Sequence, residues 1–299
     1  MKTIFKGTGV AMITPFNKNY EVDYIALERH INFLIENKVD YIVLMGTTSE
    51  AVCLNETEKN EITEFSKRII NHRVPIMYGM GGNNTHELIE KIQKFNYKNI
   101  DGILSVAPYY NKPNQEGLYQ HFKEISKCSP VEVIMYNVPG RTSVNILPET
   151  ILRISKDFSN ISSVKEASGN IDNIMQIIND KPEDFTVLSG DDAITLPLIS
   201  VGAEGVISVS ANAFPKETSQ MTNFALKHKI TEAQKIHYKL LKAVNLMFAE
   251  GNPTGVKCFL SQLNKIDNYL RLPLISASKI LENNIKNYLQ NFDYSISNN

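Results

Sequence analysis

Lys165 stands at the end of a short apolar run, which is an unusual position for a lysine. The run reads Ile161-Ser162-Ser163-Val164-Lys165 and is typical of a β-strand that carries an amine out of a buried sheet. Among apolar side chains the charged form of lysine loses hydration, so a neutral amine becomes available to attack a ketone and form a Schiff base. Many α/β proteins end a strand with a lysine, so Lys165 alone does not establish a catalytic amine.

Further residues suited to chemistry follow other apolar runs of the chain. In order they are Thr47, Thr48, Tyr110, Tyr136, Arg141, Gly190, Asp191 and Ile207. Each has an ordinary alternative: the threonines can cap a helix, the tyrosines can pack in loops, and the arginine can form a surface salt bridge. Lys165, the tyrosine one strand earlier (Tyr136), the threonine hydroxyls and Arg141 together supply an amine for a keto group, donors for its carboxylate and a proton relay. The set therefore indicates a Schiff-base enzyme for an α-keto acid.

The composition favours small-molecule chemistry. The 299 residues are 42% hydrophobic and 21% charged, and the formal net charge of -1 gives no field that would attract nucleic acid or an anionic membrane. The six histidines show no metal-binding spacing, and the three cysteines form no CxxC pair. No signal-peptide pattern or apolar run of about 20 residues is present. We therefore expect no metal, no disulfide, no membrane partner and a cytoplasmic location.

Eight short apolar runs alternate with amphipathic segments. We predict strands at residues 9–14, 41–45, 75–79, 102–106, 131–136, 161–165, 186–188 and 205–209. Helical patterns separate them, for example at residues 23–37, 56–71, 85–95 and 115–127. This alternation predicts an α/β fold, a (β/α)8 TIM barrel whose active site lies at the carboxyl ends of the strands. A doubly wound open sheet is the alternative, but no GxGxxG motif follows the first strand.

The last part of the chain is almost wholly helical in pattern. Apolar spacing predicts helices at residues 215–227, 231–250, 254–262 and 276–290. We assign residues 1–225 to a catalytic barrel and residues 226–299 to a C-terminal helical domain. Only the polar end, residues 295–299, has the composition of a loose segment.

Ordered motifs then point to a known family. The most specific are residues 136–142, 164–169, 189–192 and 205–212, and the match covers essentially the whole chain. The chain resembles the class I aldolase superfamily built around N-acetylneuraminate lyase and, within it, the dihydrodipicolinate synthase (4-hydroxy-tetrahydrodipicolinate synthase) family. The resemblance implies a lyase that condenses pyruvate with L-aspartate 4-semialdehyde, in lysine and diaminopimelate biosynthesis.

The resemblance also implies roles for individual residues. Lys165 resembles the lysine that forms the imine with pyruvate. Tyr136, Thr48 and Tyr110 resemble a hydrogen-bonded proton relay, in which Tyr110 crosses a tight dimer interface into the neighbouring subunit's site. A homo-oligomer, formed as a dimer of dimers (a homotetramer), is implied. No metal or organic cofactor is implied, because the protonated imine is itself the electron sink.

Substrate contacts are implied at the barrel mouth. Paired threonines and a backbone group would hold the pyruvyl carboxylate, an arginine would bind the carboxylate of the aldehyde, and two further residues would shape the pocket. In that order these residues are Thr47, Thr48, Ile207, Arg141, Gly190 and Asp191.

The sequence departs from the family pattern in three places. Ser49 replaces a glycine after the paired threonines, and Gly255 interrupts the element at residues 252–257, a difference expected to lie far from the chemistry. In the pocket that binds L-lysine in feedback-inhibited members, only part of the pattern is kept. The positions concerned are Ala51, Glu56, Lys59, Asn83, Glu87 and Tyr109. This half-kept pocket favours weak or absent inhibition by lysine.

Two other functions compete with the leading one. Another pyruvate-dependent class I aldolase, acting on N-acetylneuraminate or a 2-keto-3-deoxy sugar acid, would share Lys165 and Tyr136. Arg141 favours a short acidic aldehyde over a polyhydroxylated sugar. A catalytically silent ligand-binding barrel would be expected to lack the lysine or the tyrosine, and both are present.

Overall fold

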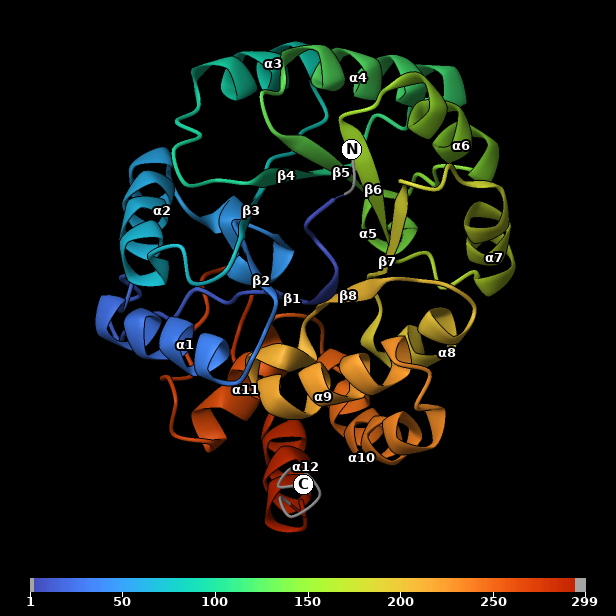
Figure 1. Cartoon of the computed structure of the whole chain (residues 1–299). Helices are drawn as coiled ribbons and strands as arrows, with labels where there is room; N and C mark the ends of the chain where they lie inside the picture. Colours follow the sequence, from blue (N-terminus) through green and yellow to red (C-terminus); the bar gives the residue numbers. More distant parts are fainter. Residues whose placement is uncertain (1–2, 294–299) are drawn as a thin grey trace.

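Eight parallel strands close into a barrel in the computed structural model, which describes residues 3–293 (Figure 1). The strands are β1 Gly7–Ala11, β2 Tyr41–Leu44, β3 Ile76–Gly79, β4 Gly102–Val106, β5 Glu132–Asn137, β6 Ile161–Glu166, β7 Thr186–Ser189 and β8 Gly205–Ser208. Each strand pairs with the next, and β1 pairs with β8 as well as β2. The predicted (β/α)8 barrel is thus confirmed, and the doubly wound sheet is excluded.

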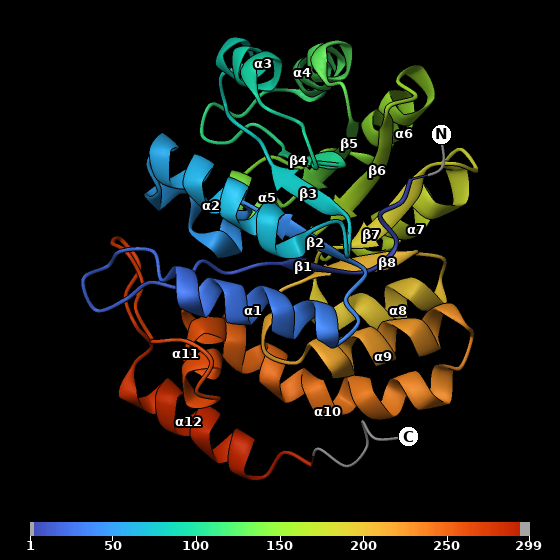
Figure 2. The same ribbon diagram turned by 60° about the vertical axis from the view of Figure 1, so that its left-hand side comes forward.

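Helices surround the barrel, and a further helical layer follows it. The surrounding helices are α1 Tyr24–Glu36, α2 Glu56–Ile70, α3 Thr85–Lys94, α4 Gln115–Cys128, α5 Pro139–Thr142, α6 Pro148–Asp157, α7 Ile171–Asp180, α8 Thr195–Ser200 and α9 Pro215–Leu226. The layer that follows is α10 Ile230–Phe248, α11 Thr254–Gln262 and α12 Lys279–Gln290. Figure 2 shows α10 beneath α8 and α9, and α11 and α12 beneath α1, all on one side of the barrel.

Local sequence signals set where several helices begin. Asn55 caps α2 through a capping box, in which its side chain accepts from the Glu58 N–H and the Glu58 carboxylate accepts from the Asn55 N–H. The Asn84 side chain caps α3 in the same region, accepting from His86 N–H. The predicted helices at residues 56–71 and 85–95 are confirmed at their first residues.

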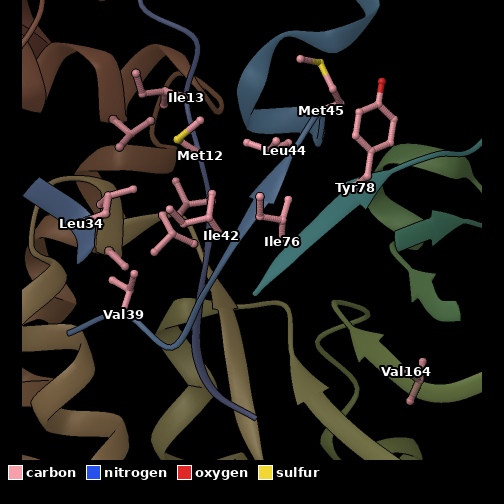
Figure 3. Close-up of a cluster of buried hydrophobic side chains, with 14 of the residues drawn as sticks. Met12, Ile13, Leu34, Val39, Ile42, Leu44, Met45, Ile76, Tyr78 and Val164 are labelled. Atoms are coloured by element: carbon pink, nitrogen blue, oxygen red, sulfur yellow. The ribbon is translucent and has the colours of Figure 1, made fainter. Parts of the chain in front are cut away.

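The pleat of each strand divides its side chains between two apolar layers. Ile42 faces the surrounding helices, whereas its neighbour Val43 lies in the barrel interior. Figure 3 shows the outer layer, where Ile42 and Ile76 lie near Leu34 of α1. The outer layer also takes in Phe259 of α11. Barrel and C-terminal helices therefore share one continuous apolar cluster.

The first strand begins earlier than predicted. The prediction of residues 9–14 is wrong at both ends, because β1 starts at Gly7, where it pairs with Gly205, and ends at Ala11. Gly9 faces the ring of Tyr41, and a Cβ atom there would lie 2.1 Å from a ring carbon. Gly9 therefore marks a close approach of the strand to a neighbouring side chain.

Two sequence-based expectations concern the ends and the location of the chain. The segment 295–299 lies outside the described residues. Within residues 3–293, no helix combines the length and apolar character that a membrane crossing requires.

Candidate active site

Lys165 lies inside the barrel at the carboxyl end of β6. Its neighbour Val164 belongs to the outer apolar layer, so the strand pleat turns Lys165 inward. The side chain is 5% exposed. Burial lowers the pKa of Lys165 to about 8; the charge of Asp192 opposes this shift, and the charge of Arg141 adds to it. The expected buried amine is therefore present.

Tyr136 is the direct neighbour of Lys165 on the adjacent strand. The two residues are paired in the register of β5 and β6, and the Lys165 Nζ lies 4.2 Å from the centre of the tyrosine ring. Burial raises the pKa of Tyr136 to about 12, although Arg141 and a side-chain hydrogen bond with Thr47 act in the opposite direction. At neutral pH the phenol therefore keeps its proton beside the amine.

The threonine loop after β2 presents its two hydroxyls to different partners. This loop is the short helix η1, Thr47–Ser49, and the hydroxyl that Tyr136 contacts is that of Thr47. Thr48 is buried, and its Oγ1 accepts a hydrogen bond of 2.9 Å from Nδ2 of Asn252. Thr48 was expected to take part in the relay with Tyr136. In this chain the hydrogen bond with Tyr136 instead involves Thr47. Ser49 closes the turn by donating from Oγ to the Gly46 carbonyl at 2.7 Å.

Asn252 joins the threonine loop to Arg141. Its backbone carbonyl accepts a hydrogen bond of 3.4 Å from Nη2 of Arg141, which lies in the short helix α5 after β5. The element at residues 252–257 was expected to lie far from the chemistry. That expectation is wrong, because the helical layer beneath the barrel folds back and inserts Asn252 beside Thr48.

Gly190 and Asp191 follow β7 at the edge of the same site. A Cβ atom on Gly190 would lie 3.0 Å from Cε of Lys165, so the glycine leaves room for the amine's side chain. The Asp191 carboxylate accepts from the Ala193 N–H, and burial raises its pKa. Ile207 of β8 belongs to the inner apolar layer together with Tyr136. Of these three residues, Gly190 is the one shown next to the side chain of the amine.

Comparison with known proteins identifies the family of this chain. The profile of the Dihydrodipicolinate synthetase family matches residues 4–292. The chain belongs to this family. Membership makes the chain an enzyme, and it agrees with the resemblance identified from the motifs.

Relatives of the dihydrodipicolinate synthetase family match over almost their full length. A relative from Flavobacterium psychrophilum, named 4-hydroxy-tetrahydrodipicolinate synthase, is 47% identical over 281 residues, which cover 94% of this chain and 96% of the relative. A protein of the same name from Methanocaldococcus jannaschii is 45% identical, covering 95% and 98%. The crystal structure of dihydrodipicolinate synthase from Thermotoga maritima has a TM-score of 0.94 at 37% identity, covering 96% and 98%. Aldolases for sugar acids are not favoured by these matches.

Tyr110 is the one predicted catalytic residue that the chain does not bring to its own site. It lies in the loop between β4 and α4 with a φ of 74°, and its side chain is 89% exposed. A tyrosine ring with this exposure has almost no contact with its own chain. The side chain of Tyr110 therefore faces outward, away from its own chain.

A cavity of about 840 Å³ extends from the barrel mouth to the space between α2 and α3. Its inner end is lined by Thr47 and Tyr136. Five of the six residues expected in a lysine-binding pocket line it too, namely Ala51, Glu56, Lys59, Glu87 and Tyr109. Asn83, the sixth, is not among the lining residues; its carbonyl accepts from Nδ2 of Asn111. Glu56 and Lys59 form an ion pair of 2.8 Å with each other.

Two polar groups near the site escaped prediction from sequence. Asp192 belongs to the motif of residues 189–192 but was given no role in the site, and Asn252 was taken only as part of a structural element; both are buried next to predicted site residues. A cluster of three or more His, Cys, Asp or Glu side chains suited to a metal ion is not found among residues 3–293.

Proposed function

We propose that this chain condenses pyruvate with L-aspartate 4-semialdehyde through an imine on Lys165, giving 4-hydroxy-tetrahydrodipicolinate. The observation that carries the mechanism is the buried amine with a pKa of about 8 beside Tyr136. At pH 7 about a tenth of such an amine is neutral, compared with well under a thousandth for an ordinary lysine. The synthase names of the relatives support the substrate pair.

The reaction follows from the neutral amine. The Lys165 nitrogen attacks the keto carbon of pyruvate, and loss of water from the resulting carbinolamine leaves a protonated imine. The imine withdraws electrons from the methyl group, a proton leaves that carbon, and the enamine attacks the aldehyde carbon of the second substrate. The amino group of the second substrate then adds to the imine carbon, which closes the ring and releases the Lys165 amine. Tyr136, which keeps its phenolic proton at neutral pH, supplies the proton that the departing hydroxyl needs.

Thr47 and Thr48 have different roles in the proposed reaction. We assign the proton relay to Thr47, because its hydroxyl is the partner of Tyr136. Thr48 accepts from Asn252, so its own hydroxyl proton remains free to donate to the carboxylate of pyruvate. The Ile207 backbone would lie beside the same carboxylate.

The second substrate would bind at the barrel mouth. Arg141 carries a planar fork suited to the terminal carboxylate of the aldehyde. Its Nη2 bond to Asn252 leaves further N–H groups for that contact. Gly190 and Asp191 would shape the floor of this subsite, next to the amine.

We also propose a homo-oligomer, a dimer of dimers, in which Tyr110 completes the relay of a neighbouring subunit. The support is its 89% exposure together with two further exposed apolar residues, Val52 and Leu272. A contiguous apolar patch that included these residues would mark an interaction surface. A cytoplasmic location suits an enzyme of amino-acid biosynthesis with three free cysteines.

Inhibition by L-lysine is proposed to be weak or absent. To bind L-lysine, the cavity between α2 and α3 would need charged side chains that are not already paired with other side chains. Glu56 there is paired with Lys59 at 2.8 Å and lies 3.7 Å from Lys91, so part of the lining is already neutralised. Titration of the enzyme with L-lysine at fixed substrate concentrations tests this point.

Borohydride reduction in the presence of pyruvate tests the imine. Mass mapping of peptides should find a pyruvyl adduct on Lys165 and none in Lys165→Ala. An adduct on another lysine, or no adduct, would overturn the mechanism. A competition assay with aspartate semialdehyde, N-acetylneuraminate and keto-deoxy sugar acids then tests the substrate. Arg141→Ala should form the imine normally and use the aldehyde poorly.

A further inference from the structure

Two buried polar side chains pair with each other at the ends of β5 and β6. Asn137 ends β5 and Glu166 ends β6, and the two are partners in the strand register directly after Tyr136 and Lys165. Because side chains alternate along a strand, both point out of the barrel, away from the amine. They are 1% and 2% exposed, and Nδ2 of Asn137 donates to Oε1 of Glu166 at 2.6 Å.

The Asn137 amide also holds the far end of the loop that carries Arg141. Its Oδ1 accepts from the Ile146 N–H at 3.0 Å, and its Nδ2 donates to Oδ1 of Asn145 at 2.8 Å. The bond to Ile146 spans nine positions of the chain, and Arg141 of α5 lies between its two ends. Ile146 is itself buried in the outer apolar layer. One side chain of β5 therefore closes this loop.

The partners of Asn137 make opposite demands on it. The Ile146 N–H can only donate, whereas the ionised carboxylate of Glu166 can only accept. The other oxygen of this carboxylate, Oε2, accepts from the N–H and the hydroxyl of Ser168 at 3.3 and 2.6 Å, which fixes its orientation. An amide at position 137 meets both demands. A carboxylate there would face a second carboxylate, and an alkyl group would meet neither demand.

The shape of the loop needs such support. Ser143, which follows α5, has a φ of 58°, a conformation that side chains other than glycine rarely adopt and that persists only where the surroundings impose it. The bond from Arg141 to the Asn252 carbonyl is long, at 3.4 Å, and gives weak support. Gln115 of α4 donates to the carbonyl of Asn145 at 2.9 Å, as a second attachment. Loss of the Asn137 amide should therefore loosen the loop without unfolding it.

We propose that Asn137, held in place by Glu166, is a positioning residue for Arg141: it fixes the loop that presents the guanidinium to the carboxylate of the aldehyde. The inference rests on the proposed role of Arg141 in binding that substrate. If the loop were loose, it would have to be ordered when the aldehyde binds, and the loss of conformational entropy would weaken binding. Imine formation with pyruvate does not use the Arg141 guanidinium, so the first substrate should be unaffected.

Asn137→Ala in the intact enzyme tests the proposal. We expect the KM for the aldehyde to rise about 3- to 10-fold, the usual range for one hydrogen bond, while borohydride trapping of pyruvate is unchanged. Asn160→Ala is the matched control, because the Asn160 amide donates to the Ser126 carbonyl at the start of β6, at the opposite end of the barrel. Its two readings should equal those of the unmodified enzyme. An unchanged KM for the aldehyde in folded Asn137→Ala would overturn the proposal.

A double variant separates positioning of Arg141 from a general loss of structure. In Arg141→Ala the loop has no guanidinium to present, so adding Asn137→Ala should raise the KM for the aldehyde no further. If Asn137 acted on the fold alone, the two effects on the KM would multiply. That result would contradict a role through Arg141.

Exchanging the two functional groups gives a second reading should Asn137→Ala fail to fold. Asn137→Asp alone brings two carboxylates together and should raise the KM for the aldehyde. Adding Glu166→Gln supplies an amide that can donate to the new carboxylate, which still accepts from the Ile146 N–H. The KM should then return towards that of the unmodified enzyme. A folded double variant no better than Asn137→Asp would show that the pair does not hold the loop.

Arg141→Ala distinguishes failure of this inference from failure of the proposed function. If the unmodified enzyme gives no pyruvyl adduct, or if Arg141→Ala leaves the KM for the aldehyde unchanged, the proposed function fails. If the adduct forms and Arg141→Ala raises that KM, but Asn137→Ala does not, the role of Asn137 alone fails.

Discussion

Gly190 leaves the space that the side chain of Lys165 occupies. A Cβ atom at position 190 would lie 3.0 Å from Cε of Lys165, 2.7 Å from the Cβ of Ala167 and 3.0 Å from the Glu166 carbonyl oxygen. The last two contacts are with groups fixed to the backbone, so only a shift of the strand ends or of the lysine could relieve them. The position of the Lys165 side chain therefore depends on residue 190 being glycine.

Gly190→Ala should accordingly displace the amine. We expect imine formation with pyruvate to slow by about 10- to 100-fold, in line with the cost of misplacing a reacting group by about 1 Å. The rate of borohydride trapping at saturating pyruvate measures this. Gly82→Ala is the matched control, because a Cβ atom at Gly82 meets nothing within 4 Å. Equal trapping rates in the two variants would show that the contact is unimportant.

Lys165 should also determine the pH dependence of imine formation. Burial lowers its pKa to about 8, and only the neutral amine attacks. The trapping rate should thus rise with pH, by about tenfold per unit below the midpoint, and level off above about pH 8. Rates measured between about pH 6 and 10 give the midpoint. A midpoint near that of an exposed lysine would mean that water reaches the amine.

Asn252 should contribute to pyruvate binding although it follows the barrel. Asn252→Ala removes the donor to Oγ1 of Thr48, and the buried hydroxyl loses its orientation. We expect the KM for pyruvate to rise about 3- to 10-fold, the usual range for one hydrogen bond, with a smaller effect on kcat. Steady-state kinetics measure both. Asn179→Ala, at an exposed asparagine whose side chain donates to Asp180, should leave the KM unchanged.

The positions of the site residues on the barrel strands could be predicted from the sequence, because two general rules determine them. Strand alternation turns Tyr136 and Lys165 inward, and parallel strands bring their carboxyl ends to one face. Asn252 could not be predicted, because its contact with Thr48 spans 204 positions and depends on how the last helices fold back. Neighbouring residues of a 3₁₀ turn point about 120° apart, so sequence alone could not decide which threonine meets Tyr136.

A buried ion pair ties the threonine loop to the last helices, and breaking it should destabilise the fold. Glu50 follows η1, and its Oε1 accepts from Nζ of Lys257 at 2.5 Å with both side chains fully buried. Its Oε2 accepts from the Arg271 N–H at 2.9 Å. Lys257→Met would leave the carboxylate unpaired and should lower the free energy of unfolding by about 3–5 kcal/mol.

A second substitution separates the unpaired charge from lost packing. Glu50→Gln combined with Lys257→Met removes both charges, so most of the lost stability should return. Urea denaturation of the two single variants and the double variant gives the coupling energy. Additive losses would show that the pair does not interact.

Tyr110 should act in the site of a neighbouring subunit, because its own chain leaves it 89% exposed. Lys165→Ala and Tyr110→Phe should each be nearly inactive alone. In a mixed dimer, the subunit that keeps Lys165 would receive Tyr110 from its partner, and one of the two sites would be intact. Random mixing of equal amounts should thus restore about a quarter of full activity, since half of the dimers are mixed. If Tyr110 served its own chain, every site would lack one group, and co-expression or subunit exchange would restore nothing.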